Sequence, residues 1–255
     1  MSEQRIVDVY LVAAGGYHDI DFARLELLKL LAEDDRVRVQ VAADYHDLEA
    51  IAEADYLITY TCDLVPTEDE QVALRDYIAS GKRWFALHGT NAIFDFTNPD
   101  GVGCPETAPV LMETLGTQFI AHPPIHPFKV TVADADHELV KGINTFETDD
   151  ELYLCRIHGD LHHLLETRFT GEATGFAESE WNDDEARPVY YINKVGDGEV
   201  LYLNLGHCRG HYDMRPLMDY YPQIERGSWE TEEYYELLRR GLKYCTNGAI
   251  EGNDP

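Results

Sequence analysis

Three histidines stand directly after segments that have the apolar, β-branched composition of strands. His18 follows residues 6–12, His88 follows residues 84–87, and His207 follows residues 199–205. In open α/β sheets, ligands bind beyond the carboxyl ends of the strands. We therefore expect these three side chains to meet at one edge of a sheet. Imidazole groups there are suited to proton transfer near neutral pH and to metal binding.

The turn at residues 87–89, Leu-His-Gly, has the layout of a nucleophile elbow, in which a sharp turn presents one side chain above the sheet. Acyl transfer needs an activated Ser, Cys or Thr at that point, and the residue presented here is His88. We predict that His88 acts as a general base and His207 as its partner acid. Cys62, which follows another strand, is a disfavoured alternative as a reactive thiol.

Glu151 is the third predicted catalytic residue. It is the last of three successive acids, residues 149–151, and the apolar residues 152–155 come directly after it. We expect the acids to open a strand over residues 151–155 that holds the Glu151 carboxylate in a fixed place. Most of such an acidic run is typical of a solvated edge. Glu151 is the exception, and we predict that it orients a histidine or shuttles a proton.

The same three histidines are equally suited to a metal ion. His18, His88 and His207 would supply three imidazole ligands to Zn²⁺ or another divalent metal, with an open position for a sugar hydroxyl or carbonyl. The sequence leaves acid–base and metal-assisted chemistry open as alternatives, and it establishes no cofactor.

Further residues near these strand ends are candidates for substrate binding. They are Gly16, His18, Asn91, His122 and Trp229. Trp229 belongs to an aromatic cluster, residues 220–229, whose ring faces are suited to a sugar ring, although such a cluster before a helix more often packs in a core. His122 and His126 lie in a loop with prolines, and they either join the site or border it.

The charge of the chain narrows the choice of ligand. Its 255 residues include 20 basic and 48 acidic side chains, which gives a formal net charge of −28. Binding to a phosphate backbone depends mainly on Lys and Arg, so this composition excludes nucleic acid and anionic membrane surfaces as partners. The expected ligand is a small, unphosphorylated, hydroxyl-rich molecule such as a sugar or keto-sugar.

The cysteines and the N-terminal segment bear on the cellular compartment. Five widely spaced cysteines form neither a disulfide framework nor a CxxC metal pair. The longest apolar stretch, residues 9–14, is far shorter than a membrane span, and no basic leader precedes an apolar segment. We expect reduced thiols and a cytoplasmic location.

The elements that must position these side chains alternate in the first half of the chain. Strands are expected at residues 6–12, 37–41, 54–61 and 84–87, with helices at residues 21–33 and 67–80 between them. This order predicts an α/β fold with a doubly wound, mostly parallel sheet. Thr67 and Glu70 have the spacing of a capping box at the start of the second helix.

The second half is richer in strands and adds a hairpin. Residues 189–194 and 199–205 flank the turn Val-Gly-Asp-Gly at 195–198, and a helix is expected at about 231–246. We predict one domain over residues 1–248 and a disordered tail over 249–255. Residues 96–110 and 167–187 are candidate lids, and the aromatic-rich residues 212–229 are a candidate surface for homo-oligomers.

Five motifs in this order resemble the ThuA-like (trehalose utilisation) family over residues 5–247. They are GGYHD (15–19), WFALHGTNAIF (84–94), GTQFIAHP (116–123), DDELY (149–153) and GEVLYLNLGH (198–207). In the third motif this chain has Gly116-Thr117 where the family usually has Gly-Gly. The final stretch, residues 225–244, resembles one branch of that family.

The resemblance implies a flavodoxin-like fold related to class I glutamine amidotransferases. In those enzymes the elbow carries a catalytic Cys, which matches His88 here, and a His-x-Glu completes the triad. His207 matches that histidine, but Arg209 stands two residues later instead of Glu. The resemblance therefore implies that glutaminase activity is absent, and it indicates a role in disaccharide and keto-sugar metabolism.

Two functions of different classes remain in view. The first is an enzyme, a lyase, isomerase or hydrolase, that acts on a sugar or keto-sugar. The second is a non-catalytic amidotransferase-like module that binds a sugar or another protein, since the nucleophile is lost. A catalytic site is expected to shift the pKa of at least one histidine, whereas a binding module has no such requirement. A pure scaffold gains little support from the sequence.

Overall fold

The computed structural model describes residues 5–251, and five neighbouring strands of its central sheet run parallel. In spatial order they are β2 (Val37–Ala42), β1 (Val7–Gly15), β3 (Tyr56–Cys62), β4 (Arg83–Leu87) and β13 (Gly198–Leu203). β3 is buried along its whole length, as expected for a parallel strand that is covered on both faces. The α/β class predicted from the alternation of strands and helices is confirmed.

The sheet continues beyond β13 with four antiparallel strands. They are β12 (Ala186–Val195), β9 (His162–Arg168), β6 (His126–Val132) and β7 (Phe146–Asp150). β12 and β13 pair from Tyr190–Leu203 to Val195–Gly198, which is the hairpin expected around residues 195–198. Two short ribbons stand beside the sheet: β5 (Thr117–Ala121) with β8 (Leu154–Ile157), and β10 (Gly171–Glu172) with β11 (Glu180–Trp181).

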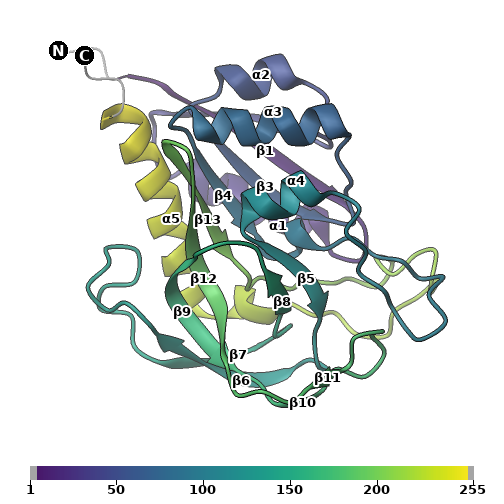
Figure 1. Cartoon of the computed structure of the whole chain (residues 1–255). Helices are drawn as coiled ribbons and strands as arrows, with labels where there is room; N and C mark the ends of the chain where they lie inside the picture. The colour runs from purple at the N-terminus through teal and green to yellow at the C-terminus, as the bar shows by residue number, and fades with distance from the viewer. Residues whose placement is uncertain (1–4, 252–255) are drawn as a thin grey trace.

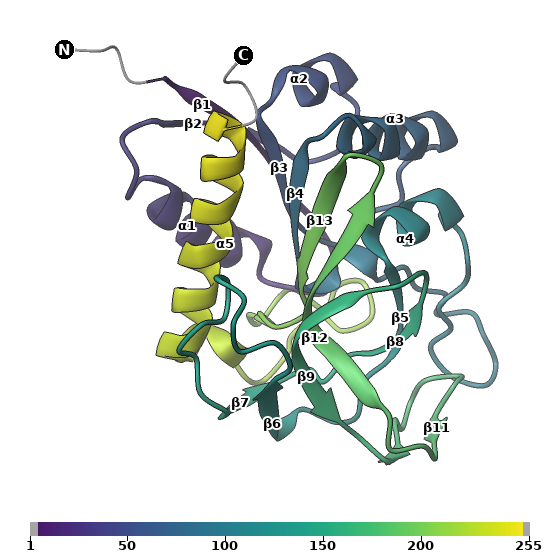
Figure 2. The same cartoon turned by 60° about the vertical axis from the view of Figure 1, so that its left-hand side comes forward.

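Helices cover both faces of the parallel strands (Figures 1 and 2). α1 (Ile20–Leu31) and α5 (Glu232–Glu251) pack on one face, while α2 (Leu48–Glu53), α3 (Glu68–Ala79) and α4 (Pro109–Leu115) pack on the other. Alternate residues of β1 separate accordingly, because successive side chains of a strand point to opposite faces. Val9 and Leu11 join the core under α1 and α5, and Tyr10 and Val12 join the core under α2, α3 and α4.

Local signals fix the ends of α3 as predicted. Thr67 accepts the Glu70 amide and Glu70 accepts the Thr67 amide, so the capping box is present. Gly81 follows the helix with φ +100°, the left-handed conformation that glycine adopts readily. α5 extends beyond the expected end near residue 246 and includes the first three residues of the predicted tail, 249–251. The rest of that tail, residues 252–255, lies outside the described residues.

The acidic run around Glu151 differs from the expectation. Residues 149 and 150 close β7 instead of opening a strand, and the next strand, β8, begins only at Leu154. The reason lies in the alternation of β7, where Phe146, Thr148 and Asp150 are buried and the residues between them are exposed. Glu151 therefore sits in the loop at the carboxyl end of β7.

Two surface features bear on earlier expectations. Within residues 5–251, no helix is long and apolar enough to cross a membrane. Several large apolar side chains stay exposed in the segment proposed for self-association, namely Tyr212, Leu217, Met218, Tyr220 and Ile224. The homo-oligomer stays a prediction.

Candidate functional site

Three strand ends bring His18, His88 and His207 together. They follow β1, β4 and β13, whose carboxyl ends lie at one edge because these strands are parallel. The His18 ring centroid lies 4.7 Å from that of His88 and 5.1 Å from that of His207. All three side chains are buried. The structure thus contains the juxtaposition that the sequence predicts.

His88 occupies a strained turn that begins the 3₁₀ helix η1 (His88–Asn91). Its φ is +45°, in the left-handed region that residues with a Cβ rarely adopt. Gly89 follows because a Cβ at that position would lie 2.8 Å from the Thr61 carbonyl oxygen. Strained backbone of this kind concentrates at functional sites, and here it holds the imidazole above the sheet edge.

Glu151 lies among the histidines. Its Oε2 is 3.6 Å from His18 Nε2 and 3.4 Å from His88 Nε2. Its Oε1 is 3.1 Å from His207 Nδ1 and 3.6 Å from His122 Nε2. We call His18, His88, Glu151 and His207 the histidine–glutamate cluster. All four members are at least 95% buried, so their interactions are little screened by water.

Asp150 holds the loops of the cluster in place, and the sequence analysis missed it. Its Oδ1 accepts the amides of Glu151 (2.7 Å) and His207 (3.1 Å). Its Oδ2 accepts the amides of Gly206 (3.0 Å) and Ser228 (2.8 Å). One fully buried carboxylate therefore joins the ends of β7 and β13 to the 3₁₀ helix η2 (Gly227–Glu230).

Hydrogen bonds behind the cluster fix which ring nitrogens point inward. His88 Nδ1 lies 2.8 Å from the Asn204 carbonyl, so it donates there and leaves the Nε2 lone pair to the cluster. His88 Nε2 lies 2.9 Å from His18 Nε2 and 3.2 Å from the Tyr153 hydroxyl. His207 Nε2 donates to Glu225 Oε2 at 2.8 Å, which directs Nδ1 toward Glu151.

Arg209 is part of the same network. Its guanidinium lies 3.4 Å from Glu151 Oε1 and 2.9 Å from Glu225 Oε2. The backbones of Arg209 and Glu225 form an isolated β-bridge that closes the loop between them. Glu225 was missed from the sequence because a single acid in so acidic a chain carries no signal. The Arg209 position, by contrast, was visible as the departure from His-x-Glu.

The environment shifts the pKa of three cluster members. Burial lowers the pKa of His18 to about 3, which keeps its ring neutral. Burial alone would raise the pKa of Glu151, but the charges of His207 and His122 hold it well below its usual range. Burial lowers the pKa of His207, yet Glu151 and Glu225 outweigh this and raise it to about 9. Ionisable groups whose pKa values are shifted in opposite directions are typical of functional sites.

The cluster has the dimensions of a metal site. Its ligand atoms all lie within 4.8 Å of one another. Zinc bonds of about 2.0–2.1 Å place neighbouring tetrahedral ligands roughly 3.3 Å apart. The N–N and N–O separations of 2.9 to 3.6 Å enclose that value. Three imidazoles and one carboxylate also match the donors that Zn²⁺ prefers.

The predicted substrate-binding residues fall into different places. His122 reaches the cluster edge, and its side chain is 22% exposed. Gly16 lies in the loop before His18, and its amide donates to the Cys62 carbonyl. Asn91 is buried, and its side-chain NH₂ group donates to the Thr117 hydroxyl at 2.6 Å. His126 is exposed on β6 and donates to the Pro124 carbonyl, so it does not join the cluster.

The role expected for Trp229 needs revision, whereas Cys62 stays disfavoured as a reactive thiol. Trp229 offers no open face to a sugar, because it is 4% exposed and packs edge-on against Phe22, Tyr60 and Tyr234. Its indole N–H donates to the Gly206 carbonyl at 2.8 Å and thereby supports the turn before His207. Cys62 is also buried, and burial raises its pKa well above the usual range, so its thiol stays protonated.

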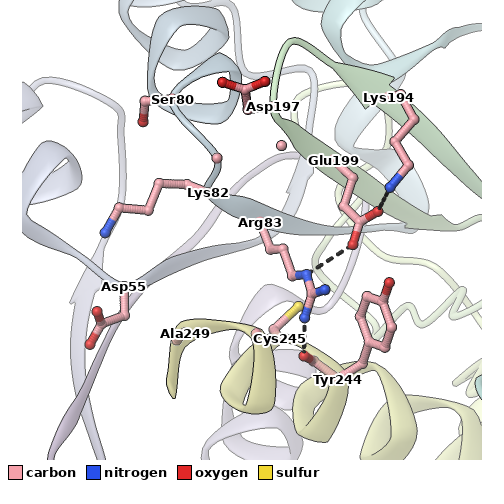
Figure 3. Close-up of a pocket in the computed structure, with 13 residues that line it drawn as sticks. Asp55, Ser80, Lys82, Arg83, Lys194, Asp197, Glu199, Tyr244, Cys245 and Ala249 are labelled. Atoms are coloured by element: carbon pink, nitrogen blue, oxygen red, sulfur yellow. Dashed lines mark hydrogen bonds and ion pairs between the residues drawn. The ribbon is translucent and has the colours of Figure 1, made fainter. Parts of the chain in front are cut away.

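A charged pocket lies at the opposite edge of the sheet, where β4 and β13 begin (Figure 3). It encloses about 510 Å³ between these strands and α5. The Arg83 guanidinium donates to Glu199 at 2.8 Å and stacks 3.9 Å from the Tyr244 ring centroid, while Lys194 also pairs with Glu199. Two of its cations thus share the Glu199 carboxylate, and the pocket lies away from the strand ends that carry the cluster.

Comparisons with solved structures place the fold among ThuA-like proteins. A ThuA-like protein from Parabacteroides merdae superposes with a TM-score of 0.66 at 14% identity, covering 96% of this chain and 91% of that one. A ThuA-like protein from Bacteroides uniformis gives 0.66 at 16% identity, covering 96% and 93%. A β-galactosidase from Rahnella sp. R3 gives 0.54 at 11% identity, covering 97% of this chain but 32% of that enzyme.

These identities establish a shared fold and nothing finer. A comparison with curated protein sequences gives no match. The family model described as trehalose utilisation matches residues 7–221, a range that contains all four members of the histidine–glutamate cluster. This family indicates a role in carbohydrate metabolism. The chain belongs to the ThuA (trehalose utilisation) family.

Proposed function

We propose that this protein is an enzyme that acts on an unphosphorylated sugar or keto-sugar, and that its histidine–glutamate cluster binds one divalent cation, with Zn²⁺ as the best match. One observation carries the proposal: three buried imidazole nitrogens lie close enough together to ligate one ion, with the buried Glu151 carboxylate beside them. Arg209 and His207, whose pKa is raised, compensate the buried Glu151 carboxylate, and a cation held by the imidazoles would take over the part of the His207 proton.

The outer hydrogen bonds support a metal site. Ligating histidines usually donate their second ring N–H to a carbonyl or a carboxylate, which fixes the tautomer and the ring orientation. His88 does so to the Asn204 carbonyl and His207 to Glu225. Both arrangements turn the other ring nitrogen toward Glu151.

Each residue then has a role that its position supports. His18, His88 and His207 would hold the cation, which would supply a Lewis acid for a sugar carbonyl or hydroxyl. Glu151 takes a proton from the carbon beside the carbonyl, since its low pKa keeps it ionised. The electron pair moves to the carbonyl oxygen. In an isomerisation, the hydroxyl on the deprotonated carbon passes its proton to the former carbonyl oxygen, and Glu151 returns its own proton to the former carbonyl carbon. In an elimination, the carbonyl re-forms, the group on the next carbon leaves with its bonding electron pair, and the proton on Glu151 neutralises it.

The charge and the elbow restrict the substrate and the reaction. A chain with a net charge of −28 disfavours phosphorylated sugars. Glutamine hydrolysis needs a reactive thiol at the elbow, and His88 stands there instead. The binding-module alternative has less support, since a binding module does not require shifted pKa values, whereas those of both His18 and His207 are shifted.

The test combines elemental analysis of the purified, untagged protein with deuterium exchange on 3-keto-glucosides, followed by NMR in D₂O. About one Zn²⁺ per chain and exchange of the proton beside the carbonyl are expected. Glu151→Gln separates the roles: it should keep the metal and lose the exchange. A metal-free protein that still exchanges the proton would assign the base to His88, and a protein that shows neither would be a binding module.

A further inference from the structure

A small aromatic core stands beside the histidine–glutamate cluster, apart from the two large cores of the sheet. Its buried members include Phe119 and Tyr153, with Tyr17, Phe94 and Phe176 packed against it. The Tyr153 hydroxyl lies 3.2 Å from His88 Nε2, so this core adjoins the cluster directly.

The rings continue from the cluster to the surface. Tyr153 contacts Phe119 at 4.5 Å between centroids, and Phe119 contacts Phe94 at 5.8 Å. Phe94 contacts Phe96 at 5.5 Å, and Phe96 is 39% exposed. A large exposed aromatic residue at the end of such a series is suited to ligand contact.

Two segments that the sequence marks as candidate lids meet over this region. The Val102 amide donates to the Gly175 carbonyl at 2.8 Å, and the Ala177 amide donates to the Val102 carbonyl at 3.0 Å. These bonds join residues 96–110 to residues 167–187. They set the Phe176 ring 4.9 Å from His122, where the cluster meets solvent.

Tyr17 completes the arrangement from the other side. Its φ is +65°, and this strained backbone is held by two hydrogen bonds, from the Tyr17 amide to the Asp213 carbonyl and from Arg209 Nε to the Tyr17 carbonyl, both 3.1 Å. The Tyr17 ring lies 5.0 Å from that of Phe96. Arg209 also contacts Glu151, so the same side chain holds the Tyr17 backbone and the histidine–glutamate cluster.

We propose that Tyr17, Phe94, Phe96 and Phe176, the aromatic rim, form a subsite that binds the apolar face of a pyranose ring in an uncharged glycoside. This inference rests on the proposed function and names its ligand. A pyranose has a face of C–H groups and an edge of hydroxyls. The rim offers rings to the face, and the half-buried Asp63, which accepts the Phe94 amide at 2.9 Å, offers a carboxylate beside it.

The test is calorimetric titration of the zinc-loaded protein with trehalose and methyl α-glucoside, and with sorbitol as an acyclic polyol of similar hydroxyl content. The variants are Phe96→Ala, Phe96→Tyr, which keeps a ring, and Val72→Ala. Val72 is the matched control, because it is 37% exposed on α3 while Phe96 is 39% exposed.

The wild type should bind the pyranosides more tightly than sorbitol. Phe96→Ala should weaken pyranoside binding about three- to tenfold, the range of one aromatic contact, whereas Phe96→Tyr and Val72→Ala should leave it unchanged. Equal affinities for sorbitol and the pyranosides, equal affinities in Phe96→Ala and wild type, or absence of any pyranoside binding would each overturn the subsite.

Metal content separates this proposal from the proposed function. Phe96→Ala should retain the same Zn²⁺ stoichiometry as the wild type, because Phe96 contacts no member of the cluster. A wild type that lacks zinc but binds pyranosides through Phe96 would keep the subsite and reject the metal site. A protein that contains zinc and binds pyranosides equally well with and without the Phe96 ring would keep the metal site and reject the subsite.

Discussion

The Nε2 atoms of His18 and His88 face each other at 2.9 Å, although the two residues are 70 positions apart. Two imidazole lone pairs at this distance repel unless a proton or a cation lies between them. Burial lowers the pKa of His18 to about 3, so its ring is neutral and carries one proton, which on Nε2 donates to the His88 Nε2 lone pair. In the proposed metal site a divalent cation would take the place of that proton and would also compensate the nearby Glu151 carboxylate.

Replacing either of two cluster histidines should remove the metal. His88→Ala and His207→Ala each delete one ligand, and we expect zinc to fall from about one ion per chain to a small fraction by elemental analysis. Circular dichroism should remain that of a folded α/β protein. His126→Ala, an exposed histidine that lies outside the cluster, is the control and should keep its zinc. Full metal content in both cluster variants would reject the ligand assignment.

Glu225 should affect the zinc affinity of the cluster without being a metal ligand. Its carboxylate accepts the His207 Nε2 proton, so Glu225→Gln weakens the control of that ring. We expect zinc affinity to fall about 10- to 100-fold, as for other residues that hydrogen-bond a metal-ligating histidine, measured by competition with a chromogenic chelator. Glu230→Gln alters an exposed acid five residues further on and should have no effect. Equal affinities in the two variants would contradict the role of Glu225.

Asp150 should contribute to stability more than its neighbour does. In the wild type, the two oxygens of Asp150 accept four backbone amides. Asp150→Asn replaces one of these oxygens with an NH₂ group, which cannot accept a hydrogen bond. We expect the free energy of unfolding to fall by about 2–5 kcal/mol in urea titrations, since buried donors lose their acceptor. Asp149→Asn, on the exposed side of β7, should change it by less than about 0.5 kcal/mol. A small effect at both positions would show that the loops hold without this carboxylate.

Glu199 should make the protein sensitive to acid. Burial alone would raise its pKa, but hydrogen bonds from Lys194 and Tyr244 and the charge of Arg83 outweigh it and lower the pKa below its usual value. A depressed carboxyl pKa stabilises the fold above the unfolded value near 4.5, and this contribution is lost as the pH falls through the folded value. Glu199→Gln should therefore cost about 1–3 kcal/mol at pH 7 and less near pH 3.

The measurement is urea unfolding of both proteins between pH 7 and pH 3. Asp197→Asn, an exposed carboxylate in the same pocket, is the control and should parallel the wild type. A difference between Glu199→Gln and wild type that stays constant with pH would mean that the ion pairs of Figure 3 contribute nothing to acid sensitivity.

The sequence was informative where local patterns decide the structure. Apolar runs and turn residues predicted the parallel strands, the α3 capping box and the hairpin at 195–198, because these depend on short-range propensity and periodicity. His88 and His207 were also predictable, since a residue that follows a parallel strand must lie at the carboxyl edge of the sheet. Glu151 does lie beside the histidines, as predicted, but it lies in a loop after β7 and not at the start of a strand.

The sequence was silent where a contact joins distant segments. Asp150 reads as one more acid in an acidic chain until its oxygens are seen to accept amides from β7, the loop after β13 and η2. From the sequence, Trp229 is a candidate to stack against a sugar ring, but its indole is buried in the core. The exposed ring belongs to Phe96, which lies in a segment without a motif.

The amino-acid sequence by itself determined the α/β class, the elbow that presents His88 and an acidity that favours uncharged ligands. Only the tertiary structure decided which imidazole nitrogens point inward, that Arg209 and Glu225 secure the cluster, and that three separate segments carry the aromatic rim beside it. The physical reason is that strands and helices follow from local periodicity, whereas ligand geometry depends on distances between side chains that are close only after the sheet has formed.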